Sequence, residues 1–85
     1  MSGFIEVLAV GKGDEKIELT QDGAENKNKV DDLLKKGYLL SVMVGDNNES
    51  VSGFDAESNS VIAKQEIRIP ANEAKITAVA PIAGG

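Results

Sequence analysis

The sequence contains no cysteine, no histidine and no tryptophan among its 85 residues. The absence of cysteine excludes disulfides, thiolate nucleophiles and cysteine-ligated metal sites. The absence of histidine removes the commonest general base and metal ligand. A self-contained hydrolase or metalloenzyme is therefore difficult to assemble from the remaining side chains. We expect a protein that is not an enzyme by itself and that binds neither a cofactor nor a metal.

Positive charge and aromatic side chains are also scarce. The formal net charge is −5, and Arg68 is the single arginine. This balance argues against nucleic acid as a partner, because phosphate contacts need Lys and Arg. The aromatic residues are only Phe4, Tyr38 and Phe54, so a core must be built from Val, Ile, Leu and Ala.

Long apolar runs and targeting signals are missing as well. Residues 1–3 lead into an apolar strand without a basic segment or a small-residue cleavage site. No apolar stretch approaches the length of a membrane span. We therefore expect no membrane partner and a cytoplasmic location. The chain length predicts one domain over residues 1–80, followed by a flexible tail over residues 81–85.

What is present is a pattern of short strands around one helix. Residues 4–10 are apolar on both faces except at Glu6, which is typical of a strand in the middle of a sheet. Residues 11–14 have the composition of a turn, and residues 16–19 alternate between polar and apolar side chains. Together these segments predict an N-terminal hairpin.

A helix is predicted over residues 23–36. Asp22, with Glu25 three positions later, forms a variant of the capping box, and Gly37 is a suitable residue to end the helix. The start around residues 26–28 is polar and is expected to fray. The apolar positions fall on one stripe that is expected to pack on the sheet, consisting of Val30, Leu33 and Leu34.

Three further segments complete the secondary structure. Residues 38–44 are predicted as a strand, and the order strand, helix, strand implies a parallel pairing with a right-handed crossover. Residues 45–60 are polar and predict a long loop with a short strand around Phe54. Residues 61–69 alternate and predict a strand that Pro70 ends. Residues 74–80 form the last strand and deliver the tail.

One helix laid across one face of a mixed sheet is a two-layer α+β domain. The order of hairpin, helix, strand, variable region and last strand is that of the β-grasp, or ubiquitin-like, fold. This order predicts that the first and last strands lie side by side and parallel at the centre of the sheet.

The tail is the most informative feature of the sequence. It runs through Pro81 and closes on Gly84 and Gly85. Because neither glycine has a Cβ, the backbone can pass through a narrow channel. Such a tail suits a protein whose reactive group is its own C-terminal carboxylate, handed into another protein's active site. The alternative is an ordinary frayed terminus.

With body and tail considered together, the chain resembles the ubiquitin-like sulfur carriers. It looks most like the small subunit of molybdopterin synthase, with the thiamine-pathway carrier as a relative. Residues 5–8 and 16–19 match the first hairpin of these carriers, and residues 30–37 match the end of their helix. The most specific match is residues 74–85, a last strand followed by proline and Gly-Gly.

The resemblance implies a function. An activating enzyme would adenylate the carboxylate of Gly85, and sulfide or persulfide would convert it to a thiocarboxylate. The terminal sulfur would then serve the large subunit of a partner synthase, most plausibly in molybdenum cofactor synthesis, although another sulfur pathway remains open. Gly84 and Gly85 would be the site of this chemistry, while Pro81, Ile82 and Ala83 would contact the partner and fix where the tail leaves the body.

Two other classes of function remain open. A ubiquitin-like modifier would use the same carboxylate to acylate lysines on target proteins. A small interaction module, of the type encoded by phages or mobile elements, would have an accidental Gly-Gly ending. A C-terminal thiocarboxylate, as opposed to isopeptide conjugates, separates the carrier from the modifier.

Overall fold

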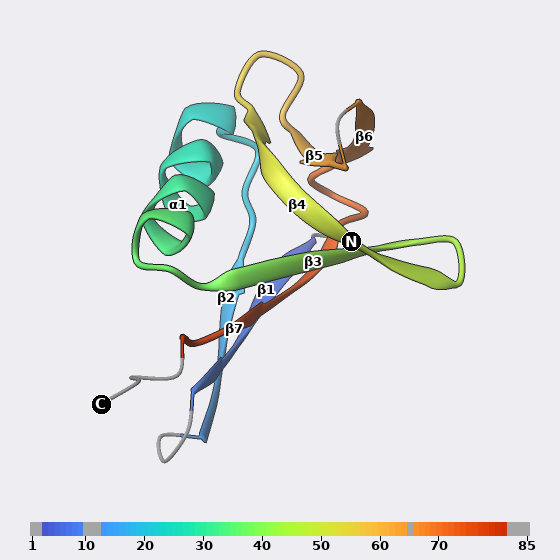
Figure 1. The fold of residues 1–85 in the computed structure, drawn as a ribbon. Helices are drawn as coiled ribbons and strands as arrows, with labels where there is room; N and C mark the ends of the chain where they lie inside the picture. The colour runs from blue at the N-terminus through green and yellow to red at the C-terminus, as the bar shows by residue number, and fades with distance from the viewer. Residues whose placement is uncertain (1–2, 10–12, 65, 82–85) are drawn as a thin grey trace.

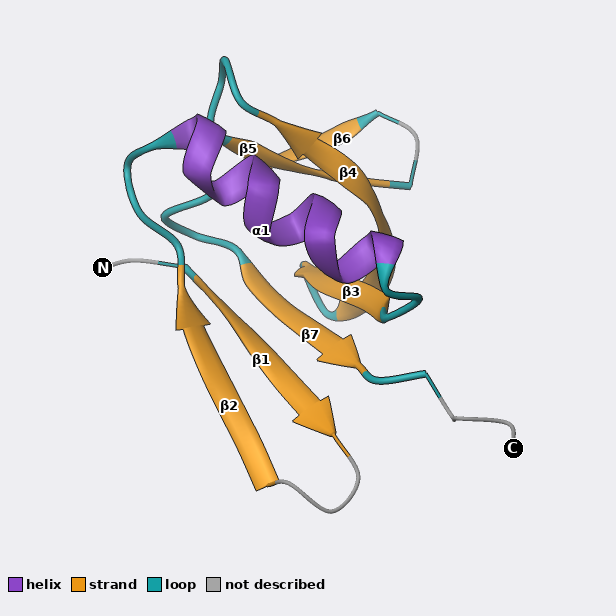
Figure 2. Ribbon diagram, turned by 90° about the vertical axis from the view of Figure 1, so that its left-hand side faces the viewer, coloured by secondary structure: helices purple, strands orange, loops and turns teal. Residues whose placement is uncertain are grey.

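The computed structural model describes residues 3–9, 13–64 and 66–81, which form a small mixed α+β structure (Figure 1). Its elements are β1 (Phe4–Ala9), β2 (Gly13–Glu18), α1 (Gly23–Lys35), β3 (Leu39–Val44), β4 (Asn47–Asp55), β5 (Ser60–Ala63), β6 (Ile67–Pro70) and β7 (Lys75–Val79). The strands form one mixed sheet in the order β2-β1-β7-β3-β4-β5-β6. Helix α1 packs against β4 and lies across one face of the sheet (Figure 2). Within the described ranges, no helix has both the length and the hydropathy needed to cross a membrane.

Strand β1 has a neighbour on each side. It forms an antiparallel hairpin with β2 and a parallel pair with β7. Ile5 of β1 lies opposite Ile17 of β2 on one side and opposite Ile76 of β7 on the other. The predicted hairpin and the predicted parallel pairing of the first and last strands are both confirmed.

Helix α1 begins at the predicted cap. The carboxylate of Asp22 accepts hydrogen bonds from the backbone N–H groups of Ala24 and Glu25, at 3.0 and 3.2 Å. These two contacts satisfy donors that have no partner inside the first turn of a helix. The observed span, Gly23–Lys35, agrees with the predicted one to within one residue.

The predicted apolar stripe of α1 faces the sheet. Val30 and Leu33 are buried, and Leu34 is partly buried against the same core. One cluster of buried apolar side chains joins the helix to the sheet, and it consists of Ile5, Val7, Leu19, Val30, Leu33, Leu40, Val42, Val51, Phe54, Val61, Ala63, Ala71, Ala74, Ile76 and Ala78. As the composition required, Phe54 is the only aromatic member of this cluster among the described residues.

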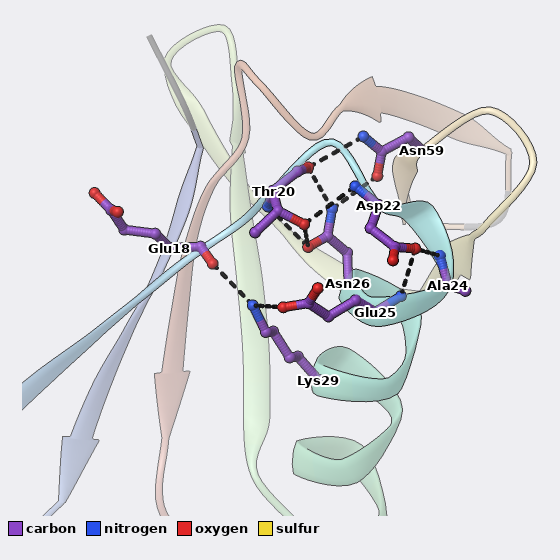
Figure 3. Close-up of polar contacts among 8 residues, drawn as sticks. All are labelled: Glu18, Thr20, Asp22, Ala24, Glu25, Asn26, Lys29 and Asn59. Carbon is purple, nitrogen blue, oxygen red and sulfur yellow. Dashed lines mark hydrogen bonds and ion pairs between the residues drawn. The ribbon is translucent and has the colours of Figure 1, made fainter.

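The prediction that the helix frays around residues 26–28 is wrong. These residues lie in the first half of α1, and Asn26 is fully buried. Its side chain forms hydrogen bonds with the backbone of Thr20 and with the side chain of Asn59 (Figure 3). The polar start of the helix is therefore anchored through contacts that are distant in sequence, and propensity alone does not indicate them.

The strands before and after the helix, β2 and β3, were predicted to pair in parallel, and this direct pairing is wrong. Strands β2 and β3 are not neighbours, because β1 and β7 lie between them. Strand β3 pairs antiparallel with β7 on one side and with β4 on the other. The strand at the end of the sequence takes the position next to β3, so the crossover spans two intervening strands.

Residues 45–60 do not form the predicted long loop. A tight turn at Gly45, where φ is +63°, leads directly into the nine-residue strand β4, Asn47–Asp55. The first half of β4 pairs with β3 and the second half pairs with β5. The exposed position of its first residues explains their polar character, which suggested a loop.

A register shift in β4 explains its irregular apolar pattern. Val51 and Phe54 are three residues apart, so strict alternation would place them on opposite faces. The pairing with β5 shifts between Val51 and Gly53, as in a β-bulge, and both apolar side chains are buried. The bulge thus brings two isolated apolar residues of a polar segment into the core.

Residues 61–69 were predicted to form one strand but belong to two. Strand β5 ends at Ala63, and β6 begins at Ile67 and pairs antiparallel with β5. Lys64, with a φ of +55°, begins the reversal. The strand ends at Pro70 as predicted, with Pro70 as the last residue of β6. This strand lies at the edge of the sheet, where a residue without an N–H is tolerated.

Candidate functional site

The tail begins at the end of β7, in the middle of the sheet. The N–H of Ala80 donates a hydrogen bond to the carbonyl of Leu8 at 3.0 Å, so the ladder with β1 continues one residue beyond the strand. Pro81 follows and is exposed. Because proline has no N–H, it cannot donate a further ladder hydrogen bond. Of the predicted site, only Pro81 is described; Ile82–Gly85 lie outside the described residues.

The C-terminal turn of α1 lies beside Pro81. The N–H groups of Gly37 and Tyr38 donate to the carbonyls of Leu34 and Leu33, at 3.1 and 3.0 Å, which is the Schellman arrangement. Gly37 has a φ of +88°, so the predicted helix-ending role of this glycine is confirmed. A Cβ built on Gly37 would lie 3.7 Å from Cγ of Pro81, so the two residues are neighbours.

An exposed apolar row crosses the sheet next to this point. Val79 of β7 lies opposite Leu8 of β1 and opposite Leu39 of β3. Leu39 is 74% exposed and Val79 is 44% exposed, whereas Leu8 is half-buried. We call Leu8, Val79 and Leu39 the exposed apolar row.

The exposed apolar row lies on the face of the sheet that α1 does not cover. The adjacent residues Val7, Leu40 and Ala78 belong to the core that includes the helix. Because successive side chains of a strand point to opposite faces, the row points away from the helix. Met43, on the same face of β3, is 41% exposed.

The sequence interpretation did not identify this row, although a signal was present. Residues 4–10 and 38–44 are apolar on both faces, apart from Glu6 and Ser41. A single helix covers one face of a sheet, so the second apolar face of these central strands needs either exposure or another molecule. One predicted helix and two apolar faces therefore indicate that one apolar face, the one with the exposed apolar row, is left without a helix.

The charges near the tail are on the surface. Lys36, at the end of α1, forms an ion pair with Asp32 at 3.0 Å, and more than half of each side chain is exposed. The hydrogen bond to Asp32 and the charge of its carboxylate raise the pKa of Lys36. Among the described residues, the buried polar side chains are those of Asn26 and Ser60, and neither is ionisable. The described part of the site thus contains no buried acid or base.

A separate polar cluster lies at the start of α1, centred on Asn26 (Figure 3). The Asn26 amide accepts from Thr20 N–H at 2.9 Å and donates to the Thr20 carbonyl and to Asn59 Oδ1, both at 2.8 Å. Asn59 also donates to the Thr20 carbonyl at 3.3 Å. These amides bond to one another and to the backbone, so the cluster ties the connection after β2 and the turn before β5 to the helix. We interpret it as structural.

A polar hollow of about 420 Å³ borders this cluster, with Thr20, Asn59 and Asn72 in its wall. Its lining contains no charged side chain. Across the described residues, no group of three or more Asp, Glu, His or Cys side chains is placed to hold a metal ion. The end of β7 is therefore the stronger candidate for the functional site.

Comparisons of the chain with protein-family models, with curated protein sequences and with solved structures gave no match.

Proposed function

We propose that this chain is a β-grasp sulfur carrier whose C-terminal glycine is converted to a thiocarboxylate. The order β2-β1-β7-β3, with α1 between β2 and β3 in the sequence, is compatible with a β-grasp core. In this proposal, β4–β6 extend that core on the β3 side. The tail, Gly84-Gly85, supplies the chemistry.

The observation that carries the proposal is the position of Pro81, the residue at which the described chain leaves the sheet after β7. Strand β7 is central in the sheet, and its end adjoins an exposed apolar row on an uncovered face. A partner that binds this face would contact the protein beside Pro81, from which the C-terminal residues continue. A carrier needs this combination, because its reactive group must enter the active site of the protein that it contacts.

The chemistry needs no side chain of the carrier. An oxygen of the Gly85 carboxylate attacks the α-phosphorus of ATP, the bond to the β-phosphate breaks, and an acyl adenylate and pyrophosphate form. Hydrosulfide then attacks the carbonyl carbon and releases AMP, which leaves the thiocarboxylate. If a persulfide is the donor, the first product is an acyl disulfide, and a second thiol of the activating enzyme releases the thiocarboxylate by forming a disulfide.

The proposed partners are the activating enzyme and the large subunit of a synthase. In the synthase, the terminal sulfur attacks the substrate and forms an acyl–sulfur bridge. Water then cleaves the bond between the acyl carbon and the sulfur, which leaves the sulfur on the substrate and returns the carboxylate. The resemblance favours molybdopterin synthase, and thus molybdenum cofactor synthesis, as the destination of the sulfur. The proposal requires Gly85 to be the last residue of the functional protein.

Reconstitution tests this proposal. The chain ending at Gly85 is incubated with a candidate activating enzyme, ATP and a sulfide donor, and the product is analysed by intact mass spectrometry. We expect a mass increase equal to the difference between one sulfur and one oxygen atom. Deletion of Gly85, addition of one residue after it, or Gly84→Val should abolish this increase.

A matched control separates the tail from general effects of glycine replacement. A Cβ added at Gly53 has no neighbour within 4 Å, so Gly53→Ala introduces a side chain without a steric consequence. This variant should be converted at the rate of the unchanged chain. Full conversion of the Gly84→Val variant would contradict the proposed passage of the tail through a narrow channel.

The exposed apolar row also favours a second candidate, a plain interaction module. Such a module would bind a partner through Leu39 and Val79 without any use of the tail. The two candidates differ in one result: truncation after Ala83 leaves the function of a module intact and abolishes that of a carrier.

A further inference from the structure

We infer that the outer edge of β2 binds a second copy of this chain, through antiparallel pairing of the two β2 strands about a two-fold axis at Ile17. The pairing joins the two sheets into one continuous sheet. Because the axis is perpendicular to the sheet, both copies present their uncovered face on the same side. The inference does not depend on the proposed sulfur chemistry, since it rests on β2 and not on the tail.

Strand β2 is an edge strand. It is the first strand in the order of the sheet, and it pairs with β1 on one side only. Figure 2 shows β2 at the margin of the sheet. Its side chains are exposed from Asp14 to Glu18, except that of Ile17, which is half-buried. An edge of this kind can pair with a strand of another molecule.

Three residues of β2 direct their backbone groups toward this outer edge. The N–H of Leu19 donates to the carbonyl of Gly3 at 3.0 Å, so the backbone groups of Leu19 point toward β1. In an antiparallel ladder this direction alternates from one residue to the next. The N–H and C=O groups that point away from β1 therefore belong to Asp14, Lys16 and Glu18.

A contact from the helix independently shows the outward direction at Glu18. The ammonium group of Lys29, on α1, donates to the backbone carbonyl of Glu18 at 3.1 Å (Figure 3). The same ammonium group forms an ion pair with Glu25 at 3.1 Å. Because a carbonyl oxygen has two lone pairs, the Glu18 carbonyl can accept a further hydrogen bond from a second strand.

The charges of β2 select one register for this pairing. A two-fold axis places the residue at its centre directly opposite the same residue of the second copy. Residues 14–18 are all charged except Ile17, so an axis at any of the other four positions puts two like charges opposite each other. Such a pair is destabilising. Charged side chains on an edge strand oppose unspecific pairing, and in β2 they leave only the register centred on Ile17.

This register also creates two pairs of opposite charge. It places Lys16 of each copy opposite Glu18 of the other, where the two residues exchange both of their outward backbone hydrogen bonds. Lys16 and Glu18 lie on the face that α1 does not cover, opposite Glu6 and Phe4 of β1. Within the described ranges, neither Lys16 nor Glu18 takes part in an ion pair. Each can therefore pair with the second copy without losing such a partner.

The centre of the interface is apolar. The two Ile17 side chains meet on the face toward α1, where Ile17 already packs against the core. Directly opposite residues that do not exchange hydrogen bonds are the closer type of pair in an antiparallel ladder, with Cα atoms about 4.5 Å apart. The half-exposed part of each Ile17 side chain thus becomes covered by the other copy.

Sedimentation equilibrium of the complete chain over a range of concentrations tests the inference. The unchanged chain should associate reversibly to a dimer. Lys16→Glu and Glu18→Lys should each weaken this association at least about tenfold, because each variant places two like-charge pairs in the interface. A chain that stays monomeric at all concentrations, or single variants that associate as well as the unchanged chain, would overturn the inference.

A mixture of the two single variants tests the register itself. In the mixed pair, Glu at position 16 of one variant lies opposite Glu18 of neither copy, because the other variant carries Lys at both positions. The equimolar mixture should therefore regain a dimer that neither variant forms alone. The double variant, Lys16→Glu with Glu18→Lys, should also regain the association of the unchanged chain. Failure of the mixture and of the double variant to associate would overturn the register centred on Ile17.

Lys35→Glu is the matched control. Lys35 is exposed in the last turn of α1, and its replacement changes the net charge as much as Lys16→Glu does. Strand β3, which follows this end of the helix, is separated from β2 by β1 and β7. The association of this variant should equal that of the unchanged chain. A loss as large as that of Lys16→Glu would show that net charge, and not the pairing of β2, controls association.

A nuclear Overhauser measurement locates the axis directly. In a mixture of carbon-13-labelled and unlabelled chain, the Hα protons of Ile17 from the two copies should be in contact, because the Cα atoms of such a pair are about 4.5 Å apart. The absence of this contact in a sample that is dimeric by sedimentation would overturn the inference.

Discussion

The two faces of the central strands differ in burial, although successive residues of the same strands contribute to them in alternation. On the face toward α1, Ile76, Ala78 and Val42 are fully buried, and Leu40 is 5% exposed. On the other face, Leu39, directly before Leu40, is 74% exposed. One face therefore contributes the apolar burial that stabilises the fold, while the other retains apolar surface that is exposed among the described residues. Substitutions on the two faces of one strand should therefore affect different properties, stability on the covered face and the proposed binding on the open face.

The largest expected effect is on the covered face. Leu33→Ala should lower the free energy of unfolding by about 2–5 kcal/mol, because the loss of a buried side chain leaves a cavity between helix and sheet. Denaturant titration measures this change. A loss below about 0.5 kcal/mol, the range of ordinary surface substitutions, would show that the helix does not depend on this face.

The polar anchor of the helix should come next. Asn26→Ala removes a fully buried amide and leaves the N–H of Thr20 and the side chain of Asn59, which are partly buried, without this partner. We expect a loss of about 1–3 kcal/mol, the cost of leaving such groups unsatisfied. Asn28→Ala is the control, because Asn28 is exposed on the same helix. Equal unfolding midpoints for the two variants would remove the anchoring role of Asn26.

On the open face, Leu39→Ser should separate binding from stability. The free energy of unfolding should change by no more than about 0.5 kcal/mol, because the side chain is already in water. KM for the activating enzyme should rise, since the partner loses an apolar contact beside the tail. Ile67→Ser, which removes an apolar side chain that is 39% exposed on β6, should leave KM unchanged. Equal KM values for both variants would contradict a docking role of the exposed apolar row.

The smallest expected effect concerns Asp55, at the end of β4. The hydrogen bond from the Ser58 hydroxyl, with further contacts from the Glu57 N–H and Arg68, lowers the pKa of this carboxyl. A depressed pKa stabilises the fold above the pKa of the unfolded chain, and this contribution is lost as the pH falls through the folded pKa. Asp55→Asn should therefore be slightly less stable at neutral pH and should match the unchanged chain in acid. A difference independent of pH would contradict this assignment.

The elements that the sequence predicted well are those specified by local patterns. The hairpin follows from apolar alternation around a turn, and α1 follows from Asp22, its apolar stripe and Gly37. Strand β4 was predicted only as a short strand around Phe54. Its first half is polar at an exposed part of the sheet, and the bulge hides the common orientation of Val51 and Phe54. A register shift depends on pairing with β5, which local sequence does not reveal.

The candidate site was predictable to a smaller extent. The position of Pro81 beyond a central strand followed from the predicted order of elements. The proximity of Gly37 to Pro81 did not follow from that order, because the two residues are 44 positions apart in the sequence. The role of Gly37 in ending the helix was also a sufficient reason for a glycine at this position. Asn26 was misjudged for the same reason, since its partner Asn59 is 33 residues away.

The most direct test of the account is the mass of the C-terminus of the protein as the cell makes it. The native protein is purified without reducing agents that exchange sulfur, and its C-terminal peptide is analysed by mass spectrometry, with thiol-specific alkylation to mark a thiocarboxylate. We expect a peptide that ends at Gly85, part of it carrying one sulfur in place of one oxygen. A native chain that continues beyond Gly85, or one that ends there but never carries sulfur even when a sulfur donor and the activating enzyme are abundant, would contradict it.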